Sequence, residues 1–224
     1  MSIFNYNQLF QTFTKFEKKF APQNLYTEGD PSLLYGGLKV SVVGSRKPSP
    51  QGINDAKCIA ETLVKNGVTV VSGLAEGIDT VAHETAIKMG GKTIAVLGTP
   101  LNITYPAKNT SLLEAIKKEH LAVSQFPQGY PILPKNFPMR NRTMALLSDA
   151  TIIVEASEKS GTKHQGWEAL RLGRFIFIMD KVVNNNNLSW PSEMINYGAQ
   201  ELTCDLLPMF LNEIPNVTAR LDYA

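Results

Sequence analysis

The sequence predicts an α/β protein with an extended Rossmann-like fold: a doubly wound, mostly parallel sheet with helices on both faces. Six apolar segments of strand length recur between residues 39 and 179, and segments with helical periodicity separate them. The strand segments are nearly continuously apolar, which is typical of strands buried on both faces of a parallel sheet. The alternation of strands and helices favours the same fold class.

The chain divides near residue 37. Residues 1–37 are predicted to be an N-terminal lead-in, with one amphipathic helix over Asn7–Phe20 and then a linker of Pro and Gly turns. Residues 38–224 are predicted to form the Rossmann-like domain and a short C-terminal tail. A chain of 224 residues, 43% of them hydrophobic, can bury a full core in such a domain.

Each predicted strand is a short apolar run. The series begins with KVSVVG, ends with FIFIM, and contains no internal repeat. The six predicted strands are Lys39–Gly44, Val68–Gly73, Lys92–Gly98, Leu121–Phe126, Ala150–Ala156 and Phe175–Met179.

Helical periodicity identifies the connecting segments. In the first of them, Ala56, Ile59, Ala60 and Leu63 share one face, and Gly67 ends the helix. The predicted helices are Gly52–Asn66, Asp79–Met89, Ser111–Lys118, Arg142–Leu147 and Gln165–Leu172. The irregular segments are a proline-rich loop over Pro127–Pro138, a polar loop over Asn184–Asn187, and a tail after Ser189 with a short helix or two.

Composition narrows the possible environments. The apolar segments are far shorter than the ~20 residues that a membrane span requires, and the N-terminus does not resemble a signal peptide. Cys58 and Cys204 are widely separated and belong to no CxxC pair. We therefore expect a cytoplasmic protein, without a membrane partner, in which both cysteines are reduced structural thiols.

Positive charge is concentrated in the middle of the chain. Residues 38–142 carry 13 Lys and Arg against 7 Asp and Glu, whereas residues 143–224 carry 6 against 10. The middle segment could therefore offer a positive surface to an anionic ligand, although a mixed solvated surface also gives such a division by chance.

Small and polar residues follow four of the predicted strands, at the edge where ligands bind in doubly wound sheets. Glycine at these turns lets backbone N–H groups approach an anion, and the following helices add their N-terminal dipoles. Arg46 contributes a planar donor fork for phosphate oxygens, and Lys163 follows the last turn. A single turn of this kind could be only a tight turn, but four at one edge favour anion binding. The turns are Gly44–Pro48, Ser72–Asp79, Leu97–Pro100 and Glu155–Thr162.

The segment FPMRNR, residues Phe137–Arg142, combines an aromatic ring with two arginines, and Lys135 precedes it. Phosphate donors beside a stacking surface are what proteins use to bind single-stranded nucleic acid. The alternatives are that Phe137 is an ordinary core aromatic and that Asn141 and Arg142 anchor a loop.

Other chemistries lack their sequence signals. The sequence has no GxGxxG after a strand and no GxxxxGK[ST], so neither a dinucleotide nor a P-loop nucleotide is predicted. His83, His120 and His164 have no metal-binding spacing, and Ser72 has no GxSxG around it. We expect no cofactor, no metal site and no catalytic residue.

Taken in order, these motifs resemble the DprA/Smf family over roughly residues 24–180. No single motif would suffice, but their order and spacing make the resemblance specific. The matching segments are NLYTEGDPSLL, KVSVVGSRKPSPQG, VVSGLAEGIDTVAHETAIKMGGKTIAVLG, YPAKN, FPQG, NFPMRNR, SDATIIVEASEKSGT and LGR.

The resemblance implies a protein that binds single-stranded DNA in a basic pocket at the carboxyl edge of the sheet. It also implies a homodimer, a RecA-type recombinase as partner, and a role in DNA uptake and recombination. By similarity, the pocket positions are Gly44, Ser45, Arg46, Gly73, Lys135, Phe137, Arg140, Asn141, Arg142, Ser160, Gly161 and Thr162. To these the residue analysis adds Lys163.

The chain departs from the family after its last glycine turn. Family members usually carry SGSL and then a Thr-Ala pair, whereas this chain has SGTKHQGWEAL, so Lys163, His164 and Trp167 alter one wall of the pocket. Gln125 stands where an acidic residue commonly precedes the proline of FPQG. Many family members have a C-terminal winged-helix domain, and from a sequence that stops at Ala224 we expect none here.

Two alternative functions use the same pocket. LOG-like phosphoribohydrolases, which release a base from a nucleoside monophosphate, carry a catalytic glutamate three residues after the threonine of PGGxGTxxE. Here that position holds Gln165, which cannot act as a carboxylate base, and Glu168 lies nearly one helical turn further on. The third possibility is a sensor that binds a small nucleotide instead of a strand.

Overall fold

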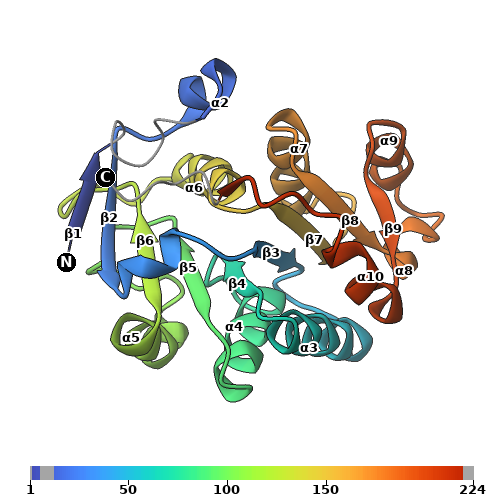
Figure 1. The fold of residues 1–224 in the computed structure, drawn as a ribbon, viewed down its shortest axis with the longest axis horizontal. Helices are drawn as coiled ribbons and strands as arrows, with labels where there is room; N and C mark the ends of the chain where they lie inside the picture. The colour runs from blue at the N-terminus through green and yellow to red at the C-terminus, as the bar shows by residue number, and fades with distance from the viewer. Residues whose placement is uncertain (1, 6–12, 219–224) are drawn as a thin grey trace.

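The computed structural model describes residues 2–5 and 13–218, and Figure 1 shows a twisted sheet that runs through these residues with helices on both sides. Within the described residues the sheet has nine strands, in the order β1-β2-β6-β5-β4-β3-β7-β8-β9. The pairs β1·β2 and β2·β6 are antiparallel and all other neighbours are parallel. The predicted fold class is therefore confirmed. The strands are β1 Ser2–Asn5, β2 Asn24–Gly29, β3 Lys39–Gly44, β4 Thr69–Ser72, β5 Thr93–Leu97, β6 Leu121–Ser124, β7 Ala150–Glu155, β8 Phe175–Met179 and β9 Gln200–Leu202.

The strand order reverses between β3 and β7, which is the topological switch point of the sheet. Helices α3, α4 and α5 cover one face, and α6 and α7 cover the other (Figure 1). The helices are α2 Lys15–Phe20, α3 Pro50–Lys65, α4 Ile78–Lys88, α5 Thr110–Glu119, α6 Asn136–Leu146, α7 Thr162–Arg171, α8 Asp180–Val183, α9 Trp190–Asn196 and α10 Leu207–Leu211. The short 3₁₀ turns are η1 Pro31–Leu34, η2 Ala107–Asn109 and η3 Cys204–Leu206.

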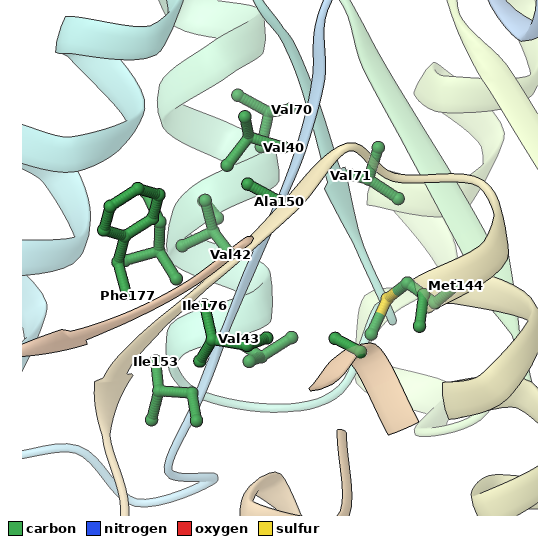
Figure 2. Packing of buried hydrophobic residues seen from close by; sticks show 14 of the residues in the cluster. Val40, Val42, Val43, Val70, Val71, Met144, Ala150, Ile153, Ile176 and Phe177 are labelled. Atoms are coloured by element: carbon green, nitrogen blue, oxygen red, sulfur yellow. The ribbon is translucent and has the colours of Figure 1, made fainter. Parts of the chain in front are cut away.

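The core is built on the central strands. Figure 2 shows Val40 and Val42 of β3 beside Val70 of β4 and Phe177 of β8, and all four are fully buried. These strands are covered on both faces, so nearly every position in them is buried and most of their residues are apolar. The apolar runs therefore identify the central strands correctly.

The predicted starts of two helices, α6 and α7, are wrong. Helix α6 begins at Asn136, so the predicted loop over Pro127–Pro138 ends too late and the predicted helix over Arg142–Leu147 begins too late. Pro138 lies in the first turn of α6, where the missing N–H removes no hydrogen bond within the helix. The proline therefore marks the start of a helix here and not a loop. Similarly, α7 begins at Thr162, three residues before the predicted helix.

The N-terminal segment contributes strands that the sequence did not predict. Strand β2 pairs with β6 and β1 pairs with β2, so residues before 38 extend the same sheet. Of the helix predicted over Asn7–Phe20, the described part is α2, which Thr14 and Glu17 begin with a capping box. The rest of that prediction lies outside the described residues. The division near residue 37 stays a prediction.

The expectation of two reduced thiols is wrong in this structure. Cys58 of α3 and Cys204 of η3 form a disulfide, with their Cα atoms 6.3 Å apart. The two residues are 146 positions apart in the chain, so only the folded arrangement shows that they are neighbours.

Within the described residues, no helix is long and apolar enough to cross a membrane.

Candidate nucleic-acid interface

A cavity of about 420 Å³ lies beyond the carboxyl ends of β3 and β7, at the switch point of the sheet. Its walls come from the turn after β3, the start of α4, helix α6 and the loop that leads into α7. Nine of the thirteen residues predicted for the site line it: Gly44, Ser45, Arg46, Phe137, Arg140, Asn141, Ser160, Gly161 and Thr162.

The turn after β3 is held in place by two hydrogen bonds to Ser45. The carbonyl of Ser45 accepts from Ile78 N at 3.1 Å, and the hydroxyl of Ser45 accepts from Lys47 N at 3.1 Å. A side chain on Gly44 would collide with that of Ile78, so glycine lets the turn lie close to α4. This packing leaves the side chains of Arg46 and Lys47 exposed to solvent beside the cavity.

Arg140 of α6 is a buried cation at the inner wall, 6% exposed. Its Nη1 donates to the carbonyl of Val96 at 3.3 Å and lies 3.9 Å from Oδ2 of Asp79. Burial lowers the pKa of Arg140, and the Asp79 carboxylate opposes that effect. Within the described residues, Nε of Arg140 has no hydrogen-bond partner.

Asp79 is the counter-ion of Arg140. Its Oδ2 accepts from the backbone N–H groups of Gly73 at 3.1 Å and Ala75 at 3.3 Å. Burial raises the pKa of Asp79, while Arg140 and these two hydrogen bonds lower it. Asp79 therefore ties the turn after β4 to the cation of α6.

Phe137 supplies an aromatic surface beside these charges. The guanidinium carbon of Arg46 lies 5.9 Å from the centre of the Phe137 ring, and the ring of Tyr105 lies 5.3 Å from it. A Cβ on Gly98 would come within 2.7 Å of Phe137, so the glycine after β5 makes room for the ring. The ring is half-buried and lines the cavity, which differs from the environment of an ordinary core aromatic.

The loop before α7 completes the opposite wall. The Thr162 hydroxyl donates to the carbonyl of Gly44 at 3.0 Å and joins this loop to the turn after β3. Ser160 accepts from Thr162 N at 3.1 Å, and Gly161 is exposed with no neighbour near its missing side chain. The first turn of α7 therefore faces the cavity, where the helix dipole favours negative charge.

Four predicted site residues lie outside the cavity lining. Lys163 donates to the carbonyl of Glu158 at 2.9 Å, and Lys135 is exposed at the start of α6. Arg142 makes two hydrogen bonds to Glu168, of 2.9 and 3.2 Å, and its guanidinium lies 4.8 Å from the ring centre of Phe20. Gly73 lies against Arg140, and its lack of a side chain leaves room for the guanidinium of that residue.

The cavity also contains residues that the predicted site omits. Lys47 adds a second exposed cation next to Arg46, and the adjacent basic pair in SRKP was the signal for it. Gln165 forms part of the wall although it is almost completely buried. The other omitted lining residues with polar side chains are Asp79, Ser157 and His164. Among the described residues, no group of His, Cys, Asp or Glu could hold a metal ion.

The fold and the cavity together define a Rossmann-like protein with a cationic, aromatic-walled cleft at the switch point of its sheet. Residues 5–208 match the family described as DNA recombination-mediator protein A. The chain belongs to this family, as the resemblance implied.

Relatives and solved structures agree with this assignment. The DNA processing protein DprA of Bacillus subtilis is 33% identical over 181 residues, which are 81% of this chain and 61% of that protein. The X-ray structure of DprA from Streptococcus pneumoniae superimposes with a TM-score of 0.79 at 34% identity, over 92% of this chain and 73% of that one. DprA from Helicobacter pylori, whose structure is described as showing a unique single-stranded DNA binding mode, gives a TM-score of 0.77 at 29% identity, over 87% and 89% of the two chains. The chain spans less than two thirds of the length of the curated relatives that it matches.

Proposed function

We propose that this protein binds single-stranded DNA in the switch-point cavity and acts as a recombination mediator during DNA uptake or recombination. The observation that carries the proposal is the guanidinium of Arg46 beside the ring of Phe137. A cation can neutralise a backbone phosphate, while the ring offers a stacking surface to an unstacked base. Bases in a duplex are already stacked on one another, so this combination favours a single strand.

The rest of the cavity supports the same ligand. Lys47 and Arg140 add positive charge, and the only carboxylate among the described lining residues is Asp79, which is already engaged by Arg140 and two backbone amides. The N-terminal turn of α7 is a further favourable position for a phosphate. By its family, we also propose that the protein is a cytoplasmic homodimer that hands the strand to a RecA-type recombinase.

We propose binding without catalysis. The carboxylate nearest in sequence to the expected catalytic position of a phosphoribohydrolase is Glu168, which accepts hydrogen bonds from Arg142 and Arg171 and is not among the residues lining the cavity. At the expected position itself stands the neutral amide of Gln165.

The test is a titration of labelled single-stranded and duplex oligonucleotides of equal length, followed by fluorescence anisotropy at two salt concentrations. We expect tighter binding of the single strand, with a logarithmic salt slope of about −0.7 for each phosphate neutralised. A mononucleotide should bind more weakly than the oligonucleotide, which separates strand binding from nucleotide sensing. Equal or tighter binding of duplex DNA, or an affinity that ignores salt, would refute the proposal.

A further inference from the structure

Helix α2 presents exposed cations beside an exposed aromatic ring. Lys15, Phe16 and Lys19 are exposed, and the ring of Phe16 packs edge-on against that of Phe20, with the ring centres 5.0 Å apart. Spacings of three and four residues place these side chains on one side of the helix. We call Lys15, Phe16, Lys19 and Phe20 the α2 surface. Phe16 is 48% exposed, so the helix offers a stacking surface between two positive charges.

Arg142 joins the α2 surface to the cavity. Its guanidinium lies 4.8 Å from the ring centre of Phe20. In α6, Arg142 follows Asn141 and stands one helical turn after Pro138, and both of these residues line the cavity. Helices α2 and α6 are in contact, and Figure 1 shows α2 beyond α6, farther from the sheet. The α2 surface therefore begins where this wall of the cavity ends.

The charges on this side of the molecule favour an anionic ligand. Helices α2, α6 and α7 together carry seven Lys and Arg but only two Glu. Both glutamates are neutralised by arginine: Glu17 is buried in an ion pair with Arg174, and Glu168 accepts hydrogen bonds from two arginines. Among the described residues, neither Lys15 nor Lys19 forms an ion pair. Their charges are therefore available to a ligand.

We propose that the α2 surface is a second contact for the single strand, reached by the part of the strand that leaves the cavity past Arg142. The inference rests on the proposed binding of single-stranded DNA and extends the path of that strand. Lys15 and Lys19 neutralise backbone phosphates, and Phe16 stacks on an unpaired base. Only strands long enough to pass from the cavity to α2 gain affinity from this contact.

The experiment titrates oligothymidines of about 4 to about 20 nucleotides, a range that includes the ~4–16 nucleotides bound by one small single-strand-binding fold. The proteins are the wild type, the double variant Lys15→Gln, Lys19→Gln, and Phe16→Ala. The control is the double variant Lys57→Gln, Lys65→Gln, which removes two exposed lysines from α3 on the opposite face of the sheet. Thermal unfolding checks that each variant folds.

We expect every variant to bind the shortest strands as the wild type does. On the longest strands, the double variant at Lys15 and Lys19 should bind about fivefold more weakly, with a logarithmic salt slope shallower by about 1.4, because two fewer phosphates are neutralised. Phe16→Ala should bind the longest strands about tenfold more weakly with an unchanged salt slope, because stacking releases no counterions. The α3 control should match the wild type at every length.

The outcomes separate this inference from the proposed function. If the α2 variants bind every strand as the wild type does, or lose the same factor on short and long strands, the α2 surface is refuted and DNA binding in the cavity stands. An equal loss in the α3 control would also refute it, because the effect would then follow from net charge alone. If the wild type binds no strand of any length, the proposed function fails and the α2 surface with it. Loss confined to long strands in both α2 variants, with the control unchanged, supports the α2 surface.

Discussion

The guanidinium of Arg140 occupies the space that a side chain on Gly73 would fill. A Cβ on Gly73 would overlap Nη1 of Arg140, and the backbone N–H of the same glycine donates to Asp79, the counter-ion of that arginine. The glycine that follows β4 is therefore needed to seat the buried cation, although it is not among the residues lining the cavity. A residue can belong to a binding site in this indirect way.

Gly73→Ala should displace Arg140 and weaken binding of single-stranded DNA. We expect a loss of unfolding free energy of about 1–3 kcal/mol, typical of overpacking, together with weaker DNA affinity. Gly161→Ala is the control for stability alone, because Gly161 lines the cavity but a methyl group there meets nothing within 4 Å and should leave stability unchanged. Denaturant unfolding and anisotropy titration measure the two effects. If Gly73→Ala retained wild-type stability and affinity, the seating role would be excluded.

Arg46→Ala should weaken DNA binding more than Lys163→Ala. Arg46 is exposed beside the cavity and next to Phe137, whereas Lys163 donates to the carbonyl of Glu158 and is not a lining residue. Losing a charged hydrogen bond to phosphate should cost about 1.5–3 kcal/mol of binding free energy, or about 10- to 100-fold in Kd. Titration of both variants, with circular dichroism as the folding control, decides the order. Wild-type affinity in folded Arg46→Ala would defeat the assignment.

The central strands could be predicted from the sequence, but the outer strands could not. Strands β3 and β8 were predicted with their observed bounds because burial on both faces makes them mostly apolar. Strand β2 alternates buried and partly exposed residues, and β9 is only three residues long. Such segments resemble turns and linkers when pairing partners are unknown. Their pairing with β6 and β8 is a property of the whole fold.

Part of the candidate site could be predicted because small and cationic residues follow the strands at one edge of the sheet. The sequence does not show which cations are already paired. Arg142 and Glu168 are 26 residues apart, and only the contact between α6 and α7 brings them together. In the sequence, Gln165 is notable only as a neutral amide at the position where phosphoribohydrolases carry a glutamate. Its burial at the cavity wall depends on how closely Gly166 lets α7 approach the sheet.

Reduction of the disulfide should destabilise the protein. The bridge between Cys58 and Cys204 ties the C-terminal segment to α3 and closes a long loop in the unfolded chain. Removing such a bridge typically costs 2–4 kcal/mol of unfolding free energy. Denaturant unfolding with and without reductant should show this difference in the wild type and none in the double variant Cys58→Ser, Cys204→Ser. A wild type that is indifferent to reductant would show that the bridge adds no stability.

The free energy of unfolding should fall at acid pH because His83 takes up a proton more readily in the unfolded state than in the native state. This histidine of α4 is fully buried, with Nδ1 2.7 Å from Oγ1 of Thr93, and burial lowers its pKa to about 3. In the unfolded chain its pKa is near 6.5, so below that pH the unfolded state binds a proton that the native state does not. The contribution of His83 to the free energy of unfolding is therefore complete above about pH 6.5. It is lost as the pH falls towards 3, and the total loss is a few kcal/mol.

The measurement for His83 is unfolding free energy against pH for the wild type, His83→Gln and the exposed control His164→Gln. We expect the slope between pH 3 and 6.5 to be smaller in His83→Gln and unchanged in His164→Gln. Equal slopes in the wild type and His83→Gln would show that His83 titrates alike in both states.

The protein should release no free base from nucleoside monophosphates, and Gln165→Glu should not create that activity. Hydrolysis of the glycosidic bond needs a carboxylate placed against an oxocarbenium-like transition state. Gln165 has only an amide, and Glu168 is held by Arg142 and Arg171. A carboxylate at position 165 alone would leave the sugar unpositioned, and poor positioning forfeits several kcal/mol of the barrier reduction. Chromatography of several nucleoside monophosphates incubated with each protein detects any free base. Turnover by the wild type that Arg140→Ala or Glu168→Ala abolishes would instead make this cavity an active site, because contaminating hydrolase would survive both substitutions.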